Sequence, residues 1–207
     1  MTGTSETSVR RSPGRPRDPE KREQVLQAAT ELLQEETWPI TVRHLVERSG
    51  VARAAIYRRW PSLDAVLADA LDHGRHPIRV RKDLDLYDAL VETYAGTDNH
   101  ASDTERMIRR RIHLNILDPD LQQQYWRSHV HRRRTPVAEL LRQGIKDGIL
   151  RADLDVEATL DLLSGVAYYQ FVARGITLEG PAVTARLRAA VDIVWQGMVR
   201  RPGPGEG

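Results

Sequence analysis

The sequence has 207 residues, of which 40% are hydrophobic and 29% are charged, and it contains no cysteine. That apolar content supports a folded core, while the lack of cysteine excludes disulfides, thiolate metal sites and cysteine nucleophiles. No apolar run approaches the roughly 18 residues of a membrane span, and the polar start lacks the apolar core of a signal peptide. We therefore expect a cytoplasmic protein.

The charges are unevenly distributed along the chain. Residues 1–60 carry eleven Lys and Arg against eight Asp and Glu, whereas residues 61–207 carry twenty against twenty-one. A basic segment on a weakly acidic body indicates a negatively charged partner at that end, and nucleic acid is the usual one. The alternative is that these side chains are simply hydrated on the surface.

Residues 1–17 are polar, rich in Gly and Pro and without periodicity, so we expect a disordered basic leader. A helix is predicted to begin after Asp18, a suitable N-cap that precedes Pro19, and to end before Trp38. Shorter helices follow, because apolar residues recur at a spacing of three and four between turn residues. They are predicted over 41–49, 51–60 and 62–71.

The remaining sequence keeps the same helical periodicity to its end. Its predicted breaks contain turn residues, among them Asp118-Pro119, Thr135-Pro136 and Gly148. No alternating β-branched runs flank a hairpin turn, so the fold class is predicted to be all-α with about nine helices. The helices of this part are predicted over 84–94, 102–117, 119–134, 136–147, 156–174 and 181–200.

Residues 41–60 have the dimensions of a helix-turn-helix motif. Gly50 permits the positive φ of a sharp turn, and Leu45, Val51 and Ile56 can face inward to join the two helices. Arginine can bond guanine or phosphate, and a tyrosine hydroxyl donates to phosphate. An ordinary helical corner with a hydrated basic face is the alternative. The outward candidates are Arg43, Arg53, Tyr57, Arg58 and Arg59.

The order of residues in this stretch is itself distinctive. A helix that begins at Thr41 is followed by Gly50-Val51, Ile56-Tyr57, Arg58-Arg59-Trp60 and Pro61-Ser62. In this order and spacing, residues 18–71 closely resemble the N-terminal domain of TetR-family transcriptional repressors. The Arg-Arg-Trp-Pro-Ser form resembles one common subgroup of that family.

The resemblance implies a homodimeric, all-helical regulator that binds a palindromic operator in double-stranded DNA. Residues 18–75 would form the helix-turn-helix domain, and residues 76–207 a domain for ligand binding and dimerisation. The third helix would be the recognition helix.

The resemblance also implies contacts for individual residues. Thr41 and Arg43 would touch DNA backbone and groove, Arg53 and Ala54 base edges, and Tyr57 a phosphate. Arg59 stands where many relatives have a backbone-binding histidine. Leu63 departs from the family's phosphate-binding lysine, so that contact is in doubt, with Arg58 or the leader as its substitute.

The leader contains Gly14-Arg15-Pro16-Arg17, which resembles an AT-hook, a motif whose arginines enter a narrow minor groove. A charged tail without a DNA contact is the alternative for this short match.

The last two predicted helices carry more apolar surface than a thin helical layer needs. In the family that the sequence resembles, these helices pair with their symmetry mates in a four-helix bundle. Burial within one subunit is the alternative. The predicted interface residues are Leu160, Leu163, Ala167, Leu187, Val191, Val194, Trp195 and Met198.

A small-molecule inducer, the ligand that the family resemblance implies, would bind between residues 84 and 147 with help from the helix at 156–174. Ordinary core packing is the alternative for each apolar candidate, since apolar residues at helical spacing mostly pack together. The candidates are Tyr87, Tyr94, Met107, Ile108, Leu114, Tyr125, Trp126, Tyr168, Tyr169 and Phe171.

Catalytic and metal-binding patterns are missing from the sequence. There is no His-Glu-x-x-His motif, and His129 and His131 are two apart, so they cannot share a helix face. We expect no metal, no cofactor and no enzyme activity. The sequence predicts a repressor released from its operator by a small molecule. The alternatives are a DNA-binding regulator that senses a protein or no ligand, and an enzyme or protein-interaction module built on a helical bundle.

Overall fold

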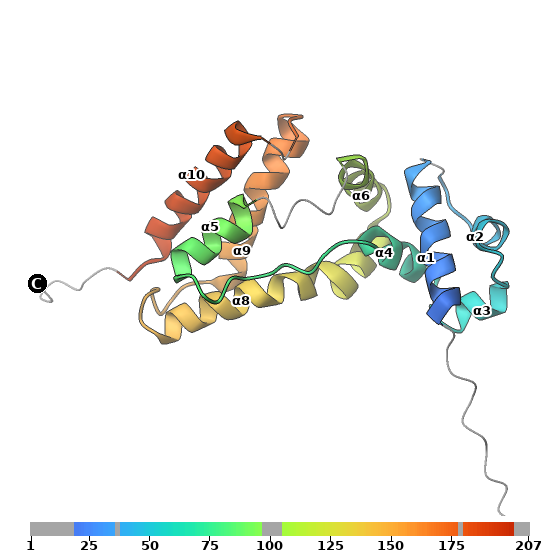
Figure 1. The fold of residues 1–207 in the computed structure, drawn as a ribbon, viewed down its shortest axis with the longest axis horizontal. Helices are drawn as coiled ribbons and strands as arrows, with labels where there is room; N and C mark the ends of the chain where they lie inside the picture. Colours follow the sequence, from blue (N-terminus) through green and yellow to red (C-terminus); the bar gives the residue numbers. More distant parts are fainter. Residues whose placement is uncertain (1–18, 36–37, 97–104, 178–179, 201–207) are drawn as a thin grey trace, which may run out of the picture.

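The computed structural model describes residues 19–35, 38–96, 105–177 and 180–200. The predicted leader and the start of the helix predicted at 102 therefore lie outside the described residues. Within them the fold is all-α (Figure 1). In chain order the elements are α1 (Pro19–Gln34), α2 (Val42–Ser49), α3 (Arg53–Tyr57), α4 (Leu63–Asp72), α5 (Leu86–Ala95), α6 (Glu105–Leu117), α7 (Pro119–Tyr125), the π-helix η1 (Trp126–Val130), α8 (His131–Lys146), α9 (Val156–Tyr168), the π-helix η2 (Tyr169–Ala173) and α10 (Pro181–Met198).

Counted by continuity, these elements make nine helices in the described part of the chain, as predicted. The segments α7, η1 and α8 follow one another without a gap, and so do α9 and η2. Helices α1, α2 and α3 lie at one end of the molecule, α5, α9 and α10 lie at the other, and α8 runs between the two ends (Figure 1).

The helices surround two separate hydrophobic cores. The first core joins α1–α4 to residues of α6 and α7, including Met107, Leu114 and Tyr125. The second core is built by α5, α8, α9 and α10. Helices α6 and α7, which lie beyond the predicted domain boundary at residue 75, thus pack on α1 and α4, and that boundary stays a prediction.

The break predicted at Thr135-Pro136 is wrong, since Pro136 lies inside α8. An internal proline costs a helix about 3 kcal/mol, because it lacks an N–H and its ring crowds the preceding turn. Directly after it, Val137, Ala138 and Leu141 are buried in the second core. Burial of a Val or Leu side chain contributes roughly 1.5–3 kcal/mol each, so packing outweighs the local cost.

The helix boundaries around the first core follow local capping chemistry. The Thr41 hydroxyl accepts a hydrogen bond from the His44 amide at 3.3 Å, and the His44 ring accepts one from the Thr41 amide. Gly50 ends α2 with φ at +67°, and its amide donates to the Val46 carbonyl. The Ser62 hydroxyl caps α4 by accepting from the Ala65 amide.

Gly50 gives a direct test of the turn between α2 and α3. Its left-handed backbone strains most L residues, although no atom within 4 Å would touch an added Cβ. We expect Gly50→Ala to lower the free energy of unfolding by about 1–2 kcal/mol, the cost of the left-handed conformation. Gly50→Asn is the matched control, because asparagine tolerates this conformation and should lose clearly less. Equal losses in urea unfolding would show that the conformation is not what requires glycine.

Candidate nucleic-acid interface

The turn between α2 and α3 is held from inside by short contacts. The Ser49 hydroxyl donates to the Leu45 carbonyl at 2.6 Å and accepts from the Val51 amide at 3.2 Å. Val51 and Ile56 are buried in the first core. Helix α3 is therefore packed against the first core. It ends at Tyr57, before the predicted end at residue 60, because residues 58 and 59 form a turn.

The predicted DNA-binding residues lie at the surface of α2 and α3. Thr41, Arg43, Arg53, Ala54, Tyr57 and Arg58 are exposed, and Arg59 is half-buried. The Arg59 guanidinium donates to the Ala55 carbonyl at 3.1 Å, which holds this side chain along its own helix.

Arg53 and Tyr57 form a pair on the exposed face of α3. The guanidinium carbon of Arg53 lies 5.5 Å from the centre of the Tyr57 ring, a cation–π distance. Tyr57 keeps 39% of its surface exposed. Neither Arg53 nor Arg58 forms an ion pair with another residue in the described part of the chain, so both guanidinium groups can turn to an external anion.

Arg43 differs, because it already has a carboxylate partner. Its Nε donates to Glu47 Oε1 at 2.7 Å, and this hydrogen bond lowers the pKa of Glu47. Both side chains are exposed, so the pair contributes little to stability and a phosphate can replace the carboxylate. Arg48, by contrast, bridges Glu31 and Glu35 and fastens α2 to α1.

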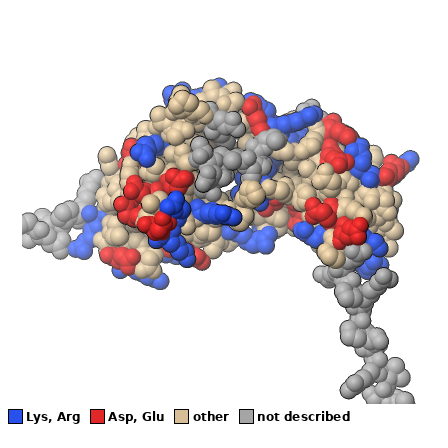
Figure 2. Space-filling view, viewed as in Figure 1, with Lys and Arg blue, Asp and Glu red and all other residues tan. Residues whose placement is uncertain are grey.

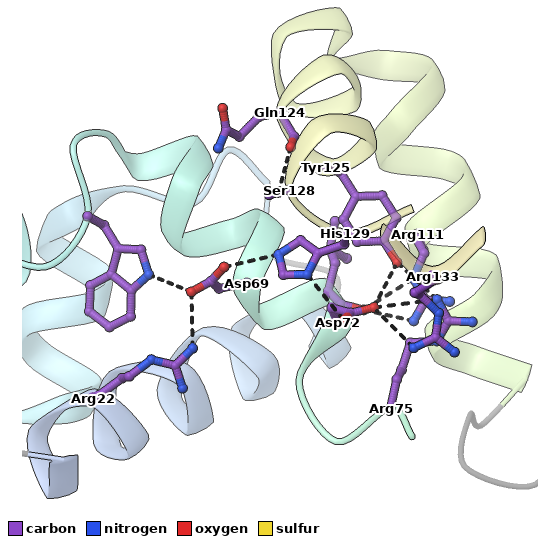
Figure 3. Close-up of polar contacts among 12 residues, drawn as sticks. Arg22, Asp69, Asp72, Arg75, Arg111, Gln124, Tyr125, Ser128, His129 and Arg133 are labelled. Carbon is purple, nitrogen blue, oxygen red and sulfur yellow. Dashed lines mark hydrogen bonds and ion pairs between the residues drawn. The ribbon is translucent and has the colours of Figure 1, made fainter. Parts of the chain in front are cut away.

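The end of the α2–α3 unit is tied to α4 by a buried tryptophan. Trp60 is 5% exposed, and its Nε1 donates to Asp69 Oδ2 at 2.9 Å (Figure 3). Asp69 also accepts from Arg22 of α1 at 3.2 Å and contacts His129 of η1 at 3.0 Å. The sequence analysis missed Asp69 and His129. The only hint is a carboxylate within the otherwise apolar run of α4.

On the face shown in Figure 2, the surface charges are of both signs. Lys and Arg alternate with Asp and Glu there, and no single-sign field covers this face.

The predicted inducer-pocket residues are not brought together in one cavity. Met107, Leu114 and Tyr125 are buried in the first core, whereas Tyr87 and Tyr94 pack on the second. Phe171 is buried beneath Arg109, whose guanidinium carbon lies 4.7 Å from the ring centre. Ile108 is half-buried, and the remaining candidates Trp126, Tyr168 and Tyr169 are exposed.

Most predicted dimer residues belong to their own subunit's core. Leu160, Leu163, Leu187, Val191 and Met198 are buried in the second core, and Ala167, Val194 and Trp195 pack against it. Periodicity identified the apolar side of α9 and α10 correctly, but that side faces inward. The large exposed apolar side chains on the same helices are Leu162, Tyr168 and Ile193. Leu162 and Ile193 were not among the predicted site residues.

Across the described ranges, no group of three or more His, Asp or Glu side chains is arranged to hold a metal ion. None of the described helices is long and apolar enough to cross a membrane.

Two family descriptions match this chain. Residues 25–70 match the bacterial regulatory proteins of the tetR family, and residues 79–194 match the tetracyclin repressor-like C-terminal domain. The uncharacterized HTH-type transcriptional regulator YdeS of Bacillus subtilis (strain 168) is 30% identical over 165 residues, which are 78% of this chain and 83% of that protein. The subgroup indicated by Arg58-Arg59-Trp60-Pro61-Ser62 stays a prediction.

Solved structures agree with this assignment. The TetR family transcription regulator SCO0332 is 27% identical, with a TM-score of 0.62 over 88% of this chain and 100% of that chain. The flavonoid-responsive regulator FrrA has a TM-score of 0.65 over 89% of this chain and 100% of that one, a likeness of fold at 16% identity. The chain belongs to the TetR family of helix-turn-helix transcriptional regulators, a non-enzymatic family whose members bind DNA.

Proposed function

We propose that this DNA-binding regulator is a homodimeric repressor that a small molecule releases from a palindromic operator. The observation that carries the proposal is a continuous chain of contacts from α3 to the body. Trp60, three residues after the end of α3, donates a hydrogen bond to Asp69 of α4, and α4 packs against α7 and η1. A ligand that favours another position of α4 would move the recognition helix. FrrA, a relative in fold, is described as flavonoid-responsive.

Base contacts and phosphate contacts are assigned to different residues of α3. Arg53, exposed and without a carboxylate partner among the described residues, would bond a guanine edge together with the neighbouring Ala54 surface. Tyr57 would donate its hydroxyl to a phosphate, with Thr41, Arg43, Arg58 and Arg59 as further backbone contacts.

This assignment predicts two different mutational patterns on a selected operator and its single-base variants. Arg53→Ala should cost about 1–3 kcal/mol of binding and relax the preference at one position in each half-site. Tyr57→Phe should weaken binding to every variant by a similar factor, because the lost donor faces the backbone.

Lys146→Ala is the control for the lost charge, since Lys146 is exposed at the end of α8 far from α3 (Figure 1). Fluorescence anisotropy measures the affinity of the Arg53→Ala, Tyr57→Phe and Lys146→Ala proteins for each operator of the panel. Equal losses for Arg53→Ala on every operator would assign this arginine to phosphate instead.

Dimerisation is assigned to the outer faces of α9 and α10. Leu162 is 62% exposed and Ile193 is 72% exposed, and small residues such as Gly165 and Ala189 flank them on the same faces. A shallow groove along α9 is lined by Leu162, Gly165 and Tyr169 among others. Two such helix pairs, one from each subunit, can bury these side chains in a four-helix bundle.

A charge at this face should separate the subunits. Ile193→Asp would bury an unpaired carboxylate in the dimer, a cost of several kcal/mol, and we expect a monomer by analytical ultracentrifugation. Because helix-turn-helix dimers bind two half-sites about 34–36 Å apart, the variant should bind a palindrome no better than one half-site.

Ile116→Asp is the matched control for this experiment. Ile116 is also 72% exposed but lies on α6, so its replacement should leave the dimer intact. If the Ile193→Asp protein is still a dimer, the interface lies elsewhere. In either case the circular dichroism of the Ile193→Asp variant should show unchanged helix content, since Ile193 lies outside the subunit core.

Ligand release has its own test. A small-molecule library is screened for compounds that lower operator affinity, and any hit must have its own affinity lowered by DNA by the same factor. If the operator is bound but no compound changes that affinity, the alternative holds and the regulator senses a protein partner or no ligand.

A further inference from the structure

His129 lies between two carboxylates of one helix. It is 7% exposed, its Nε2 is 3.0 Å from Asp69 Oδ1, and its Nδ1 is 3.2 Å from Asp72 Oδ2 (Figure 3). An ionised carboxylate only accepts hydrogen bonds, so both ring nitrogens must donate. Only the imidazolium form has two N–H groups, so this geometry fits a charged His129 between two ionised carboxylates.

The two carboxylates connect this imidazolium to both parts of the molecule. Asp69 accepts from Trp60, which follows α3, and from Arg22 of α1. Asp72 accepts from the Tyr125 hydroxyl at 3.4 Å and lies 3.7 Å from Arg133 of α8. His129 thus joins the end of the recognition helix to the long helix that runs into the second core.

The backbone around His129 is unusual as well. His129 belongs to η1, a π-helical turn closed by the His131 amide on the Trp126 carbonyl. Such turns are rare and occur frequently at functional sites. This turn lies in the continuous helix formed by α7, η1 and α8, between Val130, which packs against the first core, and Val137, which is buried in the second.

Titratable and charged groups face His129 from every neighbouring element. Helix α4 supplies the two carboxylates, and the groups around them are cationic or phenolic. These groups are Arg22 of α1, Arg75 after α4, Arg111 of α6, Tyr125 of α7 and Arg133 of α8. The Tyr125 ring also stacks on the imidazole, with 5.5 Å between ring centres.

These surroundings shift the pKa values of His129, Asp69 and Asp72. Burial alone would lower the pKa of His129, but hydrogen bonds and attraction from Asp69 and Asp72 outweigh it and raise that pKa. Burial would raise the pKa of Asp69 and Asp72, yet the bonds from His129 keep both below their ordinary value. These shifts favour an imidazolium between two ionised carboxylates.

We propose that His129 is a positioning residue, whose imidazolium holds α4 and the attached recognition helix at a fixed orientation on the body. A neutral imidazole has one N–H, so after proton loss one carboxylate would face a ring lone pair. The two aspartates would then repel each other without a cation between them. The DNA-binding unit would gain freedom to turn against the body.

The direction of the pH effect follows from linkage. Because the pKa of His129 is raised in the folded protein, the stabilisation is complete below the ordinary histidine value of about 6.5. It is lost as the pH rises through the raised value. On the acid side, the contribution of Asp69 and Asp72 is lost only as the pH falls through their lowered pKa values.

The test uses the full-length protein without DNA, so its failure would leave the proposed repressor function untouched. Nitrogen NMR of the imidazole first measures the pKa of His129, which we expect above the ordinary value. Because the chain has no cysteine, Gln24→Cys on α1 and Glu139→Cys on α8 can carry spin labels. Labelled chains are diluted with unlabelled ones, and the intrachain distance distribution is recorded on both sides of the measured pKa.

We expect a narrow distribution below that pKa and a broad one above it. His129→Gln should be broad at both pH values, because a neutral amide cannot replace the imidazolium. His73→Gln is the matched control. His73 follows the end of α4 and is half-buried, and its Nε2 lies 2.7 Å from Oε1 of a single carboxylate, Glu23. It should keep the wild-type response.

Three results would overturn the proposal: a His129 pKa at or below the ordinary value, a distribution that stays narrow across the titration, or an unchanged response in His129→Gln. If His129→Gln loses its helical circular dichroism, the wild-type titration and the His73→Gln control still decide the question.

Discussion

The structure depends on one helix that two parts of the molecule share. Helix α4 packs against α1 and also against α7 and η1. All residues from Ala65 to Leu71 are buried except Asp69, which is the one charged residue among them. Asp69 and Asp72 are half-buried, and a carboxylate withdrawn from water is costly unless it is paired, so these two residues favour cationic and N–H-donating neighbours around α4. Asp69 accepts hydrogen bonds from Trp60 and Arg22 of the DNA-binding helices, and it contacts His129 of the body.

The DNA-binding helices share their hydrophobic core with helices of the body. Leu121 and Tyr125 of α7 and Leu114 of α6 fill the same core as Leu26 and Leu45. A displacement of α7 or η1 must therefore be transmitted to α4 or open a cavity in a closely packed core. Such a connection links the position of α7 and η1 to that of the DNA-binding helices.

Local patterns made the DNA-binding half predictable. Thr41, Gly50 and Ser62 mark helix ends through contacts within a few residues, and the exposed side of a short helix follows from its spacing. The long-range features were hidden. Periodicity located the apolar sides of α9 and α10 but not what covers them, so Leu187 and Val191 were assigned to the wrong surface. Asp69 and His129 are 60 residues apart, and neither belongs to a motif.

The central claim is that α4 opens together with α6 and α7 as one cooperative unit, and native-state hydrogen exchange of backbone amides tests it most directly. Amides of one such unit exchange with a common free energy of opening. We predict one shared value for the interior amides of α1, α4 and α7, distinct from that of α9 and α10. A shared value for α1 and α4 with a separate, lower one for α7 would contradict this account, because the DNA-binding helices would then be a domain of their own.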